Sequence, residues 1–448
     1  MRGRMILTAM AVVLASGVAT AQPTRREVVA RYADLVLATY EDALRGAQTL
    51  RLAVDGFVAA PTAEGLATAR RAWLDARPAY LQTEMARFYD GPIDNAETGP
   101  EAFLNAWPLD EAYIDYVGGG AACAGDCDAG GGVTIDELVR AVGIALGSGA
   151  ADGCASLDAN ANGQVSIDEL VTAVGNALGG CAGVSAGGII NEPALYPVIT
   201  ADLLIALNEA ESETTISSGW HAIEFLLWGQ DRTADGPGQR PYTDYLTNGS
   251  GTAANQDRRS DYLRAAAALL ETHLTAVRDA WVTGDPTNYR AELLAVDPDE
   301  ALRRMLTGMG TLSGGELTGE RLAVAFETKD QEDEHSCFSD NTHVDHRNDE
   351  IGIENAFLGR YGEVAGPGVF DLVAAENPAL ATRTREAIAA ARQALFAIPV
   401  PFDQAILGPD SAPGRQAIAA AIDALNAQTD LIAQCAEALG ISISTTPP

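Results

Sequence analysis

Apolar residues recur at intervals of three and four along most of the 448-residue chain. This spacing places them on one face of an α-helix, so it predicts amphipathic helices that pack through their apolar faces. No segment shows the alternation of apolar and polar residues that is typical of a half-buried strand. The sequence therefore predicts an all-α fold with the packing of helical bundles. The predicted helices cover residues 25–60, 62–89, 199–210, 259–281, 299–309, 316–327, 382–396 and 415–439.

The segment 217–231, SSGWHAIEFLLWGQD, is apolar nearly all round and predicts a buried helix. Its single histidine and single glutamate, His221 and Glu224, are three residues apart and share one face. Burying an imidazole beside a carboxylate costs several kcal/mol unless each group is paired or binds something. Two interpretations stay open. The two side chains satisfy each other and fix the helix packing, or they belong to a ligand pocket.

Residues 118–188 are rich in glycine and cysteine and contain an internal repeat. VTIDELVRAVGIALG (133–147) returns as VSIDELVTAVGNALG (165–179). A match this close over a short period indicates a duplicated supersecondary unit. The calcium-loop pattern D-x-[DN]-x-[DN]-G-x5-E overlaps the start of each copy. Because this spacing supplies the oxygen ligands that Ca2+ needs around a tight turn, we expect the unit to bind one or two calcium ions.

The second loop matches the calcium pattern fully, whereas Gly130 replaces a side-chain ligand in the first. We therefore expect the second loop to bind Ca2+ more tightly. The alternative is a pair of turns that cap the two helices without binding metal. The expected ligands are Asp126, Asp128, Gly132, Thr134 and Glu137 in the first loop, and Asp158, Asn160, Asn162, Gln164, Ser166 and Glu169 in the second.

The glycine-rich segments before both loops are poor helix formers, so the unit is loop-then-helix twice. In this respect it resembles a dockerin more than a complete pair of EF-hands. Because so small a unit cannot stand on its hydrophobic core alone, we expect its four cysteines to staple it, in a pairing that the sequence leaves open. These are Cys123, Cys127, Cys154 and Cys181. The two remaining cysteines, Cys337 and Cys435, are then expected to pair with each other.

The N-terminal segment MRGRMILTAMAVVLASGVATAQ has two arginines, a short apolar run and a small-x-small site that ends at Ala21. This pattern predicts a signal peptide, and hence an exported protein, periplasmic or secreted, without a transmembrane segment in the mature chain. The formal charge is −33, from 62 acidic and 29 basic residues. Such acidity argues against a nucleic-acid partner, and it indicates either solubility alone or attraction of cations.

Five phrases outside the repeat resemble the imelysin family. They are FYDGPID (88–94), NAWPLDEAYIDYV (105–117), GWHAIEFLLWGQD (219–231), DQEDEHSCFSDNTHVD (330–345) and PFDQAI (401–406). In that family DYV is followed within a few residues by GIIN, here residues 188–191. The resemblance thus implies that the calcium unit is an insertion in a surface loop, where insertions are tolerated. It also implies two bundle-like halves, with the G-x-H-x-x-E motif of Gly219, His221 and Glu224 in a pocket near their junction.

These observations together predict the domain organisation. A signal peptide (1–21) precedes a body in two parts (22–117 and 188–441). The calcium module (118–187) is inserted between the two parts, and a short tail (442–448) follows them.

The resemblance implies two chemistries, because the family is associated with bacterial iron uptake and also carries a metallopeptidase label. A zinc peptidase motif H-E-x-x-H is absent from the sequence. Histidines and carboxylates spaced three apart ligate iron or manganese in bundle cores, and such sets suit iron or zinc. Residues that could complete a metal or ligand pocket with His221 and Glu224 are Glu84, Glu101, Asp110, Glu111, Glu332, Glu334, His335, His343 and Asp345. For the acidic stretch around 332–340 a solvated surface is the alternative.

Three functions follow from this reading. The first is an exported protein that binds iron or a ferric chelate in the pocket of His221 and Glu224 and serves iron uptake. The second is a zinc-dependent endopeptidase of the imelysin type. The third is a docking protein whose calcium module binds a protein or cell-surface partner.

Overall fold

The computed structural model describes residues 22–117, 124–125, 127, 133–146, 154–158, 165–179, 188–231, 236–248, 250–251 and 254–446. The predicted signal peptide lies outside these residues. In chain order the α-helices are α1 (Arg25–Ala59), α2 (Ala63–Leu81), α3 (Glu111–Ile114), α4 (Ile135–Ala145), α5 (Ile167–Gly179), α6 (Gly188–Asn191), α7 (Ala201–Leu207), α8 (Gly219–Trp228), α9 (Gln256–Asp279), α10 (Tyr289–Ala295), α11 (Pro298–Thr311), α12 (Val324–Thr328), α13 (Thr342–Leu358), α14 (Val369–Glu376), α15 (Pro378–Ala397), α16 (Phe402–Ile406) and α17 (Pro413–Ala438). The 3-10 turns are η1 (Glu84–Ala86), η2 (Glu101–Phe103), η4 (Ala155–Leu157), η5 (Tyr242–Tyr245), η7 (Gln331–Asp333) and η8 (Cys337–Ser339), and η6 (Leu312–Ala323) is a π-helix.

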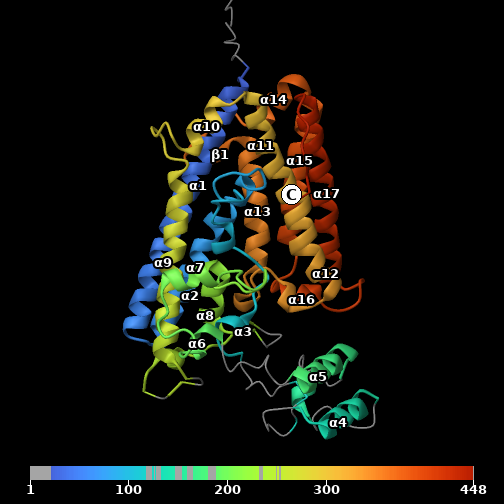
Figure 1. Ribbon diagram of the computed structural model, residues 1–448. Helices are drawn as coiled ribbons and strands as arrows, with labels where there is room; N and C mark the ends of the chain where they lie inside the picture. Colours follow the sequence, from blue (N-terminus) through green and yellow to red (C-terminus); the bar gives the residue numbers. More distant parts are fainter. Residues whose placement is uncertain are drawn as a thin grey trace, which may run out of the picture.

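The body consists of two groups of long helices that lie side by side (Figure 1). In one group α1 packs against α2 and α9, and in the other α17 packs against α15 and η6. Helix α13 contacts both α2 and α15, so it joins the two groups. Within the described residues the strands are limited to a two-residue hairpin, β1 (Arg360–Tyr361) and β2 (Val364–Ala365). The prediction of an all-α fold with two bundle-like halves is confirmed.

Helix α2 is shorter than the sequence pattern predicts. Thr62 caps its start by accepting a hydrogen bond from the backbone of Gly65, as expected, but the helix ends at Leu81 rather than near residue 89. Beyond it, the carboxylate of Asp94 accepts hydrogen bonds from the backbone of Phe88, Tyr89 and Gly91. This carboxylate holds the chain in a loop, because it satisfies backbone donors that a helix would otherwise satisfy.

Helices α11 and α12 and the π-helix η6 between them form one uninterrupted helical stretch, where the sequence predicts two separate helices. In η6 the hydroxyl of Thr318 donates to the carbonyl of Ser313, five residues earlier, at 2.6 Å. The wider turn also lets the guanidinium of Arg321 reach the carboxylate of Glu316, again five residues back, at 2.8 Å. Because π-turns are uncommon and frequently occur at functional sites, Glu316 and Arg321 are candidate site residues.

The two ends of the predicted insertion meet on the body. Gly188, the first residue of α6, has φ +57°, and a Cβ there would lie 2.6 Å from the backbone carbon of Ile114 in α3. The side-chain amide of Asn191 donates to the carboxylate of Asp115 at 3.1 Å. The chain therefore leaves the body and returns to it at one point, with close backbone contact across the gap.

We expect that removal of residues 118–187 leaves a folded helical body. Asp115 contacts Asn191 and Ile114 contacts Gly188, so the residues on either side of the segment are already close in space. The deletion therefore joins two chain ends that lie next to each other. Circular dichroism should show a cooperative thermal transition and a helix content reduced only by that of α4 and α5. Loss of the cooperative transition would contradict the expectation.

The described residues between 127 and 173 form a small core of their own. Helices α4 and α5 bury Ala141, Ile144 and Ala173, together with Leu157 and Val165. A disulfide joins Cys127 to Cys154, with an S–S distance of 2.02 Å. The predicted positions that lie outside the described residues are Cys123, Cys181, Asp126, Asp128, Gly132, Asn160, Asn162 and Gln164.

The two acidic residues at the ends of the predicted calcium loops cap their own helices in this structure. Glu137 accepts hydrogen bonds from the backbone of Thr134 and Cys127, both at 2.7 Å. Glu169 accepts from the backbone of Ser166 at 2.7 Å. The same oxygens are the expected calcium ligands, so an ion at either loop would have to compete with these capping bonds.

The predicted pairing of Cys337 with Cys435 is wrong, because both cysteines are free and buried. Cys435 lies on α17, with its sulfur 3.2 Å from the hydroxyl of Thr384 on α15. Cys337 begins η8, which packs against α8. The count of cysteines suggested a pair, but the fold places the two thiols in different neighbourhoods.

Candidate functional site

Helix α8 is buried along its whole length, as its composition predicts. It begins at Gly219, whose φ is +87°, and a Cβ there would lie 2.6 Å from the carbonyl oxygen of Leu104. The backbone of Trp220 donates to that same carbonyl at 2.8 Å. Only glycine combines this φ with so close an approach. Gly219 thereby holds α8 against the loop that carries Asn105 and Trp107.

The side chains of His221 and Glu224 form a buried pair. Nδ1 of His221 lies 3.0 Å from Oε2 of Glu224, and Oε1 of Glu224 accepts from the hydroxyl and the backbone of Ser339 at 2.6 and 3.0 Å. Burial raises the pKa of Glu224 to about 8, although Ser339 opposes the shift, and burial lowers the pKa of His221 well below its usual value. Nε2 of His221 is buried without a hydrogen-bond partner.

Asp345 on α13 is the centre of a second buried set. Its carboxylate accepts from Nδ1 of His335 at 2.8 Å, from the hydroxyl of Ser336 at 2.6 Å and from Nη2 of Arg77 at 2.6 Å. Arg77 also donates to the side-chain oxygen of Asn105 at 2.7 Å, and the amide nitrogen of Asn105 lies 3.3 Å from Nε2 of His335. Burial lowers the pKa of His335 to about 4, despite its bond to Asp345, so the ring is neutral near pH 7.

Arg77 is a member of this site that we did not predict. Its guanidinium is fully buried and lies within 5.3 to 5.7 Å of the ring centres of Trp73, Tyr80 and Trp220. The sequence carried a signal for it, because Arg77 stands four residues after Trp73 and three before Tyr80. A charged residue at a core position of an amphipathic helix needs a buried partner, which here is Asp345.

A cavity of about 480 Å³ opens beside these groups. His335 and Asn105 belong to its wall, and Trp107 separates it from His221, whose ring centre is 4.9 Å from that of Trp107 and 4.8 Å from that of His335. The lining residues are Arg87, Glu101, Asn105, Ala106, Trp107, Pro108, Glu209, Glu213, Glu316, Glu320, Arg321, Val324, Asp333 and His335.

Arg87, Arg321, Glu101 and Glu316 make the inner wall of this cavity highly charged, and the two arginines also pair with the buried Glu84, which does not line it. Glu84 accepts from Arg87 at 2.7 Å and from Arg321 at 2.6 Å. Burial alone would raise the pKa of Glu84, but the two guanidinium groups outweigh it and lower the pKa to about 2. Arg87 also pairs with Glu101 at 3.0 Å, and Arg321 with Glu316 at 2.8 Å. The sequence predicted Glu84 and Glu101 but neither arginine.

Five other predicted residues lie away from the cavity. Asp110 caps α3 by accepting from the backbone of Ala112, and Glu111 lies beside Glu332, whose pKa is raised to about 9 by burial and by that neighbour. Glu334 is buried, and burial raises the pKa of its carboxyl well above the usual range. His343 is half-buried on α13. The structure thus unites His221, Glu224, His335, Asp345, Glu84 and Glu101, and it leaves these five outside.

The residues fit a transition metal only in part. In the chain as far as it is described, no three histidine, cysteine, aspartate or glutamate side chains are grouped so that they could hold one ion. Each imidazole nevertheless turns Nδ1 to a carboxyl group, His221 to Glu224 and His335 to Asp345. Nε2 of His221 is then buried without a partner, whereas Nε2 of His335 contacts the amide nitrogen of Asn105. Histidine ligands of metals commonly have such a carboxylate partner.

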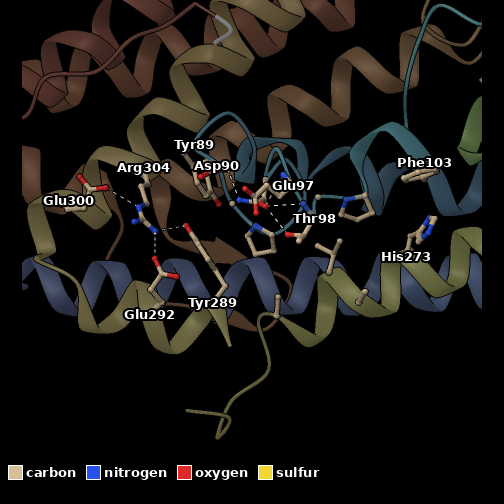
Figure 2. A pocket seen from close by; sticks show the side chains of 18 of the residues that line it. Tyr89, Asp90, Glu97, Thr98, Phe103, His273, Tyr289, Glu292, Glu300 and Arg304 are labelled. Atoms are coloured by element: carbon tan, nitrogen blue, oxygen red, sulfur yellow. Dashed lines mark hydrogen bonds and ion pairs between the residues drawn. The ribbon is translucent and has the colours of Figure 1, made fainter. Parts of the chain in front are cut away.

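A second and larger cavity, of about 820 Å³, lies on the other side of the loop that follows α2 (Figure 2). Arg304 crosses it and donates to the hydroxyl of Tyr289 at 3.1 Å and to Glu292 and Glu300 at 3.0 Å. His273 lies at the far end beside Phe103, with 5.1 Å between their ring centres. None of the residues predicted for the site lines this cavity.

Comparison with known proteins agrees with this arrangement. A family model described as imelysin matches residues 36–432. The chain belongs to the imelysin family. Iron-regulated protein A of Synechococcus elongatus is 23% identical over 411 residues, which cover 89% of this chain and 82% of that protein.

Two solved structures share the imelysin fold with this chain. The structure of a putative iron-regulated protein A precursor from Parabacteroides distasonis has a TM-score of 0.57 at 19% identity, covering 94% of this chain and 97% of that one. The structure of an imelysin-like protein from Psychrobacter arcticum has a TM-score of 0.55 at 14% identity, covering 95% and 99%.

Proposed function

We propose that this imelysin is an exported protein that binds iron, as a small chelate, in the cavity beside His335 and His221. The observation that carries the proposal is the pair of neutral imidazoles, 4.8 Å apart, each fixed through Nδ1 by a buried carboxylate. Of the two rings only His335 lines the cavity, and its Nε2 would bind the iron after it releases the amide of Asn105, while His221 packs against that ring and against Trp107. The remaining ligands of the iron would come from a chelator or from water. Relatives named as iron-regulated proteins support the same role.

A chelate accounts for the cavity better than a bare ion does. A volume of about 480 Å³ far exceeds that of one cation and suits a small molecule. The carboxylates of Glu84, Glu101 and Glu316 are already paired with Arg87 or Arg321, so they are poor additional ligands. The same arginines could instead receive the carboxylates of a chelator, which guanidinium groups bind in a bidentate manner.

The outer rim of the cavity is acidic, with exposed side chains from Glu209, Glu213 and Glu320. Together with the net charge of −33, this rim should raise the local concentration of cations. A rim that attracts the metal and an interior that can hold its chelator fit a binding protein. The two histidines come from α8 and from the loop before α13, so they do not form the H-E-x-x-H helix of a zincin.

We expect His335→Ala and His221→Ala each to weaken binding of ferric citrate at least tenfold, which corresponds to about 1.4 kcal/mol. The loss of stability from His221→Ala should be modest, because Glu224 keeps the hydroxyl and the backbone of Ser339 as partners. Titration calorimetry would measure the affinity, and denaturant unfolding the stability. His273→Ala, which removes a histidine from the other cavity, is the matched control and should bind normally.

Unchanged ferric citrate binding in both variants would overturn the proposal. If His221→Ala unfolds the protein while His335→Ala binds normally, the pair of His221 and Glu224 is structural. Gallium citrate, which has the same charge and shape without redox chemistry, would separate binding from reduction of the metal.

Export is the second part of the proposal. The N-terminal pattern predicts a signal peptide. One structural relative is named as a precursor. Within the described residues no helix is long and apolar enough to cross a membrane. The signal pattern and the name of this relative support a mature protein that functions in the periplasm or outside the cell.

The inserted module, we propose, binds calcium through its two loops. Capping bonds from Glu137 and Glu169 place both carboxylates at the ends of the loops, where the bidentate ligand is needed. We expect Glu169→Gln to cost more calcium affinity than Glu137→Gln, because only the second loop has all its side-chain ligands. Calorimetry with calcium on both variants would decide, and a larger loss from Glu137→Gln would contradict the ranking.

A further inference from the structure

Both helices of the inserted module expose a row of large apolar side chains. The row on α4 consists of Ile135, Val139, Val142 and Leu146, and the row on α5 of Ile167, Val171 and Val174; we call these the two stripes. The stripes occupy equivalent positions of the repeat, at the same spacing of four and three. Each copy of the repeat therefore carries an exposed apolar stripe in addition to its predicted calcium loop and its core residues.

The stripes do not belong to the core of the module. On α4 the core side chains are Leu138, Ala141 and Ile144, which lie roughly 130° around the helix from the stripe. On α5 the corresponding core positions are Leu170 and Ala173. A helix that is apolar on two faces is expected to be covered on both. In the part of the chain that the structure describes, only the core face is covered.

The exposed apolar area of the two stripes is large for a monomeric protein. Ile135, Leu146 and Ile167 are each 77 to 79% exposed, and Val139 and Val171 are 67 and 63% exposed. The seven stripe residues together expose roughly 700 Å² of apolar side chain, more than the few hundred Å² usual for a patch on a monomer. Burying the stripes of two chains against each other would remove roughly 1,400 Å² from water, within the range of specific interfaces.

We propose that the stripes of α4 and α5 form the interface between two copies of this chain, related by a two-fold axis. A two-fold interface uses the same surface on both copies, so α4 of one copy can cover α5 of the other and the reverse. All four stripes are then buried in one closed, four-helix contact. A partner with a single complementary groove would cover one stripe and leave its duplicate exposed.

The test is the mass of the intact mature protein in calcium-containing buffer, measured by sedimentation over a range of concentrations. Wild type should have twice the mass of one chain. The double variant Val139→Glu with Val171→Glu should have the mass of one chain, because it buries two charges in the apolar contact. Leu52→Glu on α1 is the matched control, since Leu52 is as exposed as Val139, at 67%, and lies outside the module. It should keep the double mass.

Removal of residues 118–187 provides a second variant that does not depend on how the module tolerates charge, and it should also have the mass of one chain. A wild-type protein with the mass of one chain would overturn the proposal, even if another protein bound the stripes. So would a double mass that persists in the glutamate variant or after removal of the module. Ferric citrate binding is expected to be equal in all of these proteins, so the outcome is independent of the proposed pocket.

Discussion

The Asp345→Asn variant is expected to lose roughly 3–5 kcal/mol of folding free energy. Asp345 is fully buried and is the carboxylate that neutralises the buried guanidinium of Arg77. An asparagine can accept one of the hydrogen bonds from Arg77, His335 and Ser336, but it cannot balance the charge. The variant therefore leaves a cation unpaired between α2 and α13, the helix that joins the two halves of the body.

Urea unfolding followed by circular dichroism would measure the loss. Asp75→Asn is the control on α2, the helix that carries Arg77, because Asp75 pairs with Arg71 at 3.8 Å and both side chains are about 70% exposed. An exposed pair of this kind contributes less than about 1 kcal/mol. Equal effects of the two substitutions would show that the buried pair is not the structural link that its geometry indicates.

The second large effect is expected at Asp115, where the inserted module joins the body. Its carboxylate accepts from Arg240 at 2.5 Å and from Arg259 at 2.6 and 2.9 Å, and all three side chains are buried. Asp115→Asn leaves two guanidinium groups without a counter-charge, and we expect a loss of roughly 3–5 kcal/mol. The same substitution should loosen Asn191, which donates to this carboxylate.

The free energy of unfolding measured over a range of pH distinguishes a contribution from the charge of Asp115 from one that comes from packing alone. Burial would raise the pKa of Asp115, but Arg240 and Arg259 outweigh it and lower the pKa to about 2, from 3.8. A carboxylate with a lowered pKa stabilises the fold above its unfolded pKa, and this stabilisation disappears as the pH falls from about 4 to about 2. Wild type should lose about 2 kcal/mol over this window that Asp115→Asn does not lose. Parallel pH curves for the two proteins would contradict the assignment.

The sequence predicted the long helices well because their buried positions are apolar. Helices α1, α9, α15 and α17 follow the predicted ranges within a few residues. Helix α13 was not predicted, although it is central to the site. Its buried positions include Asp345, His346, Asp349 and Glu350. A helix that buries charges shows no apolar stripe, so the pattern that reveals the other helices cannot reveal this one.

The candidate site was predicted in part for a related reason. His221 and Glu224 stood out as polar residues in an apolar helix, and the family resemblance brought in His335 and Asp345. Arg77, Arg87 and Arg321 were not predicted, because the prediction was limited to side chains that bind metals and arginine does not bind them. The acids Asp110 and Glu332 were predicted but lie away from the cavity, since sequence shows which residues are acidic but not which of them converge.

The closure between Asp115 and Asn191 also bears on how this protein arose. A body whose chain ends touch at the point of insertion does not depend on what the insertion contains, so one gene segment could enter or leave without a change in the pocket. Relatives of this imelysin are then expected to differ at this point by whole modules rather than by gradual lengthening of a loop. The helical body and the unit between its two parts can be inherited, exchanged and selected separately.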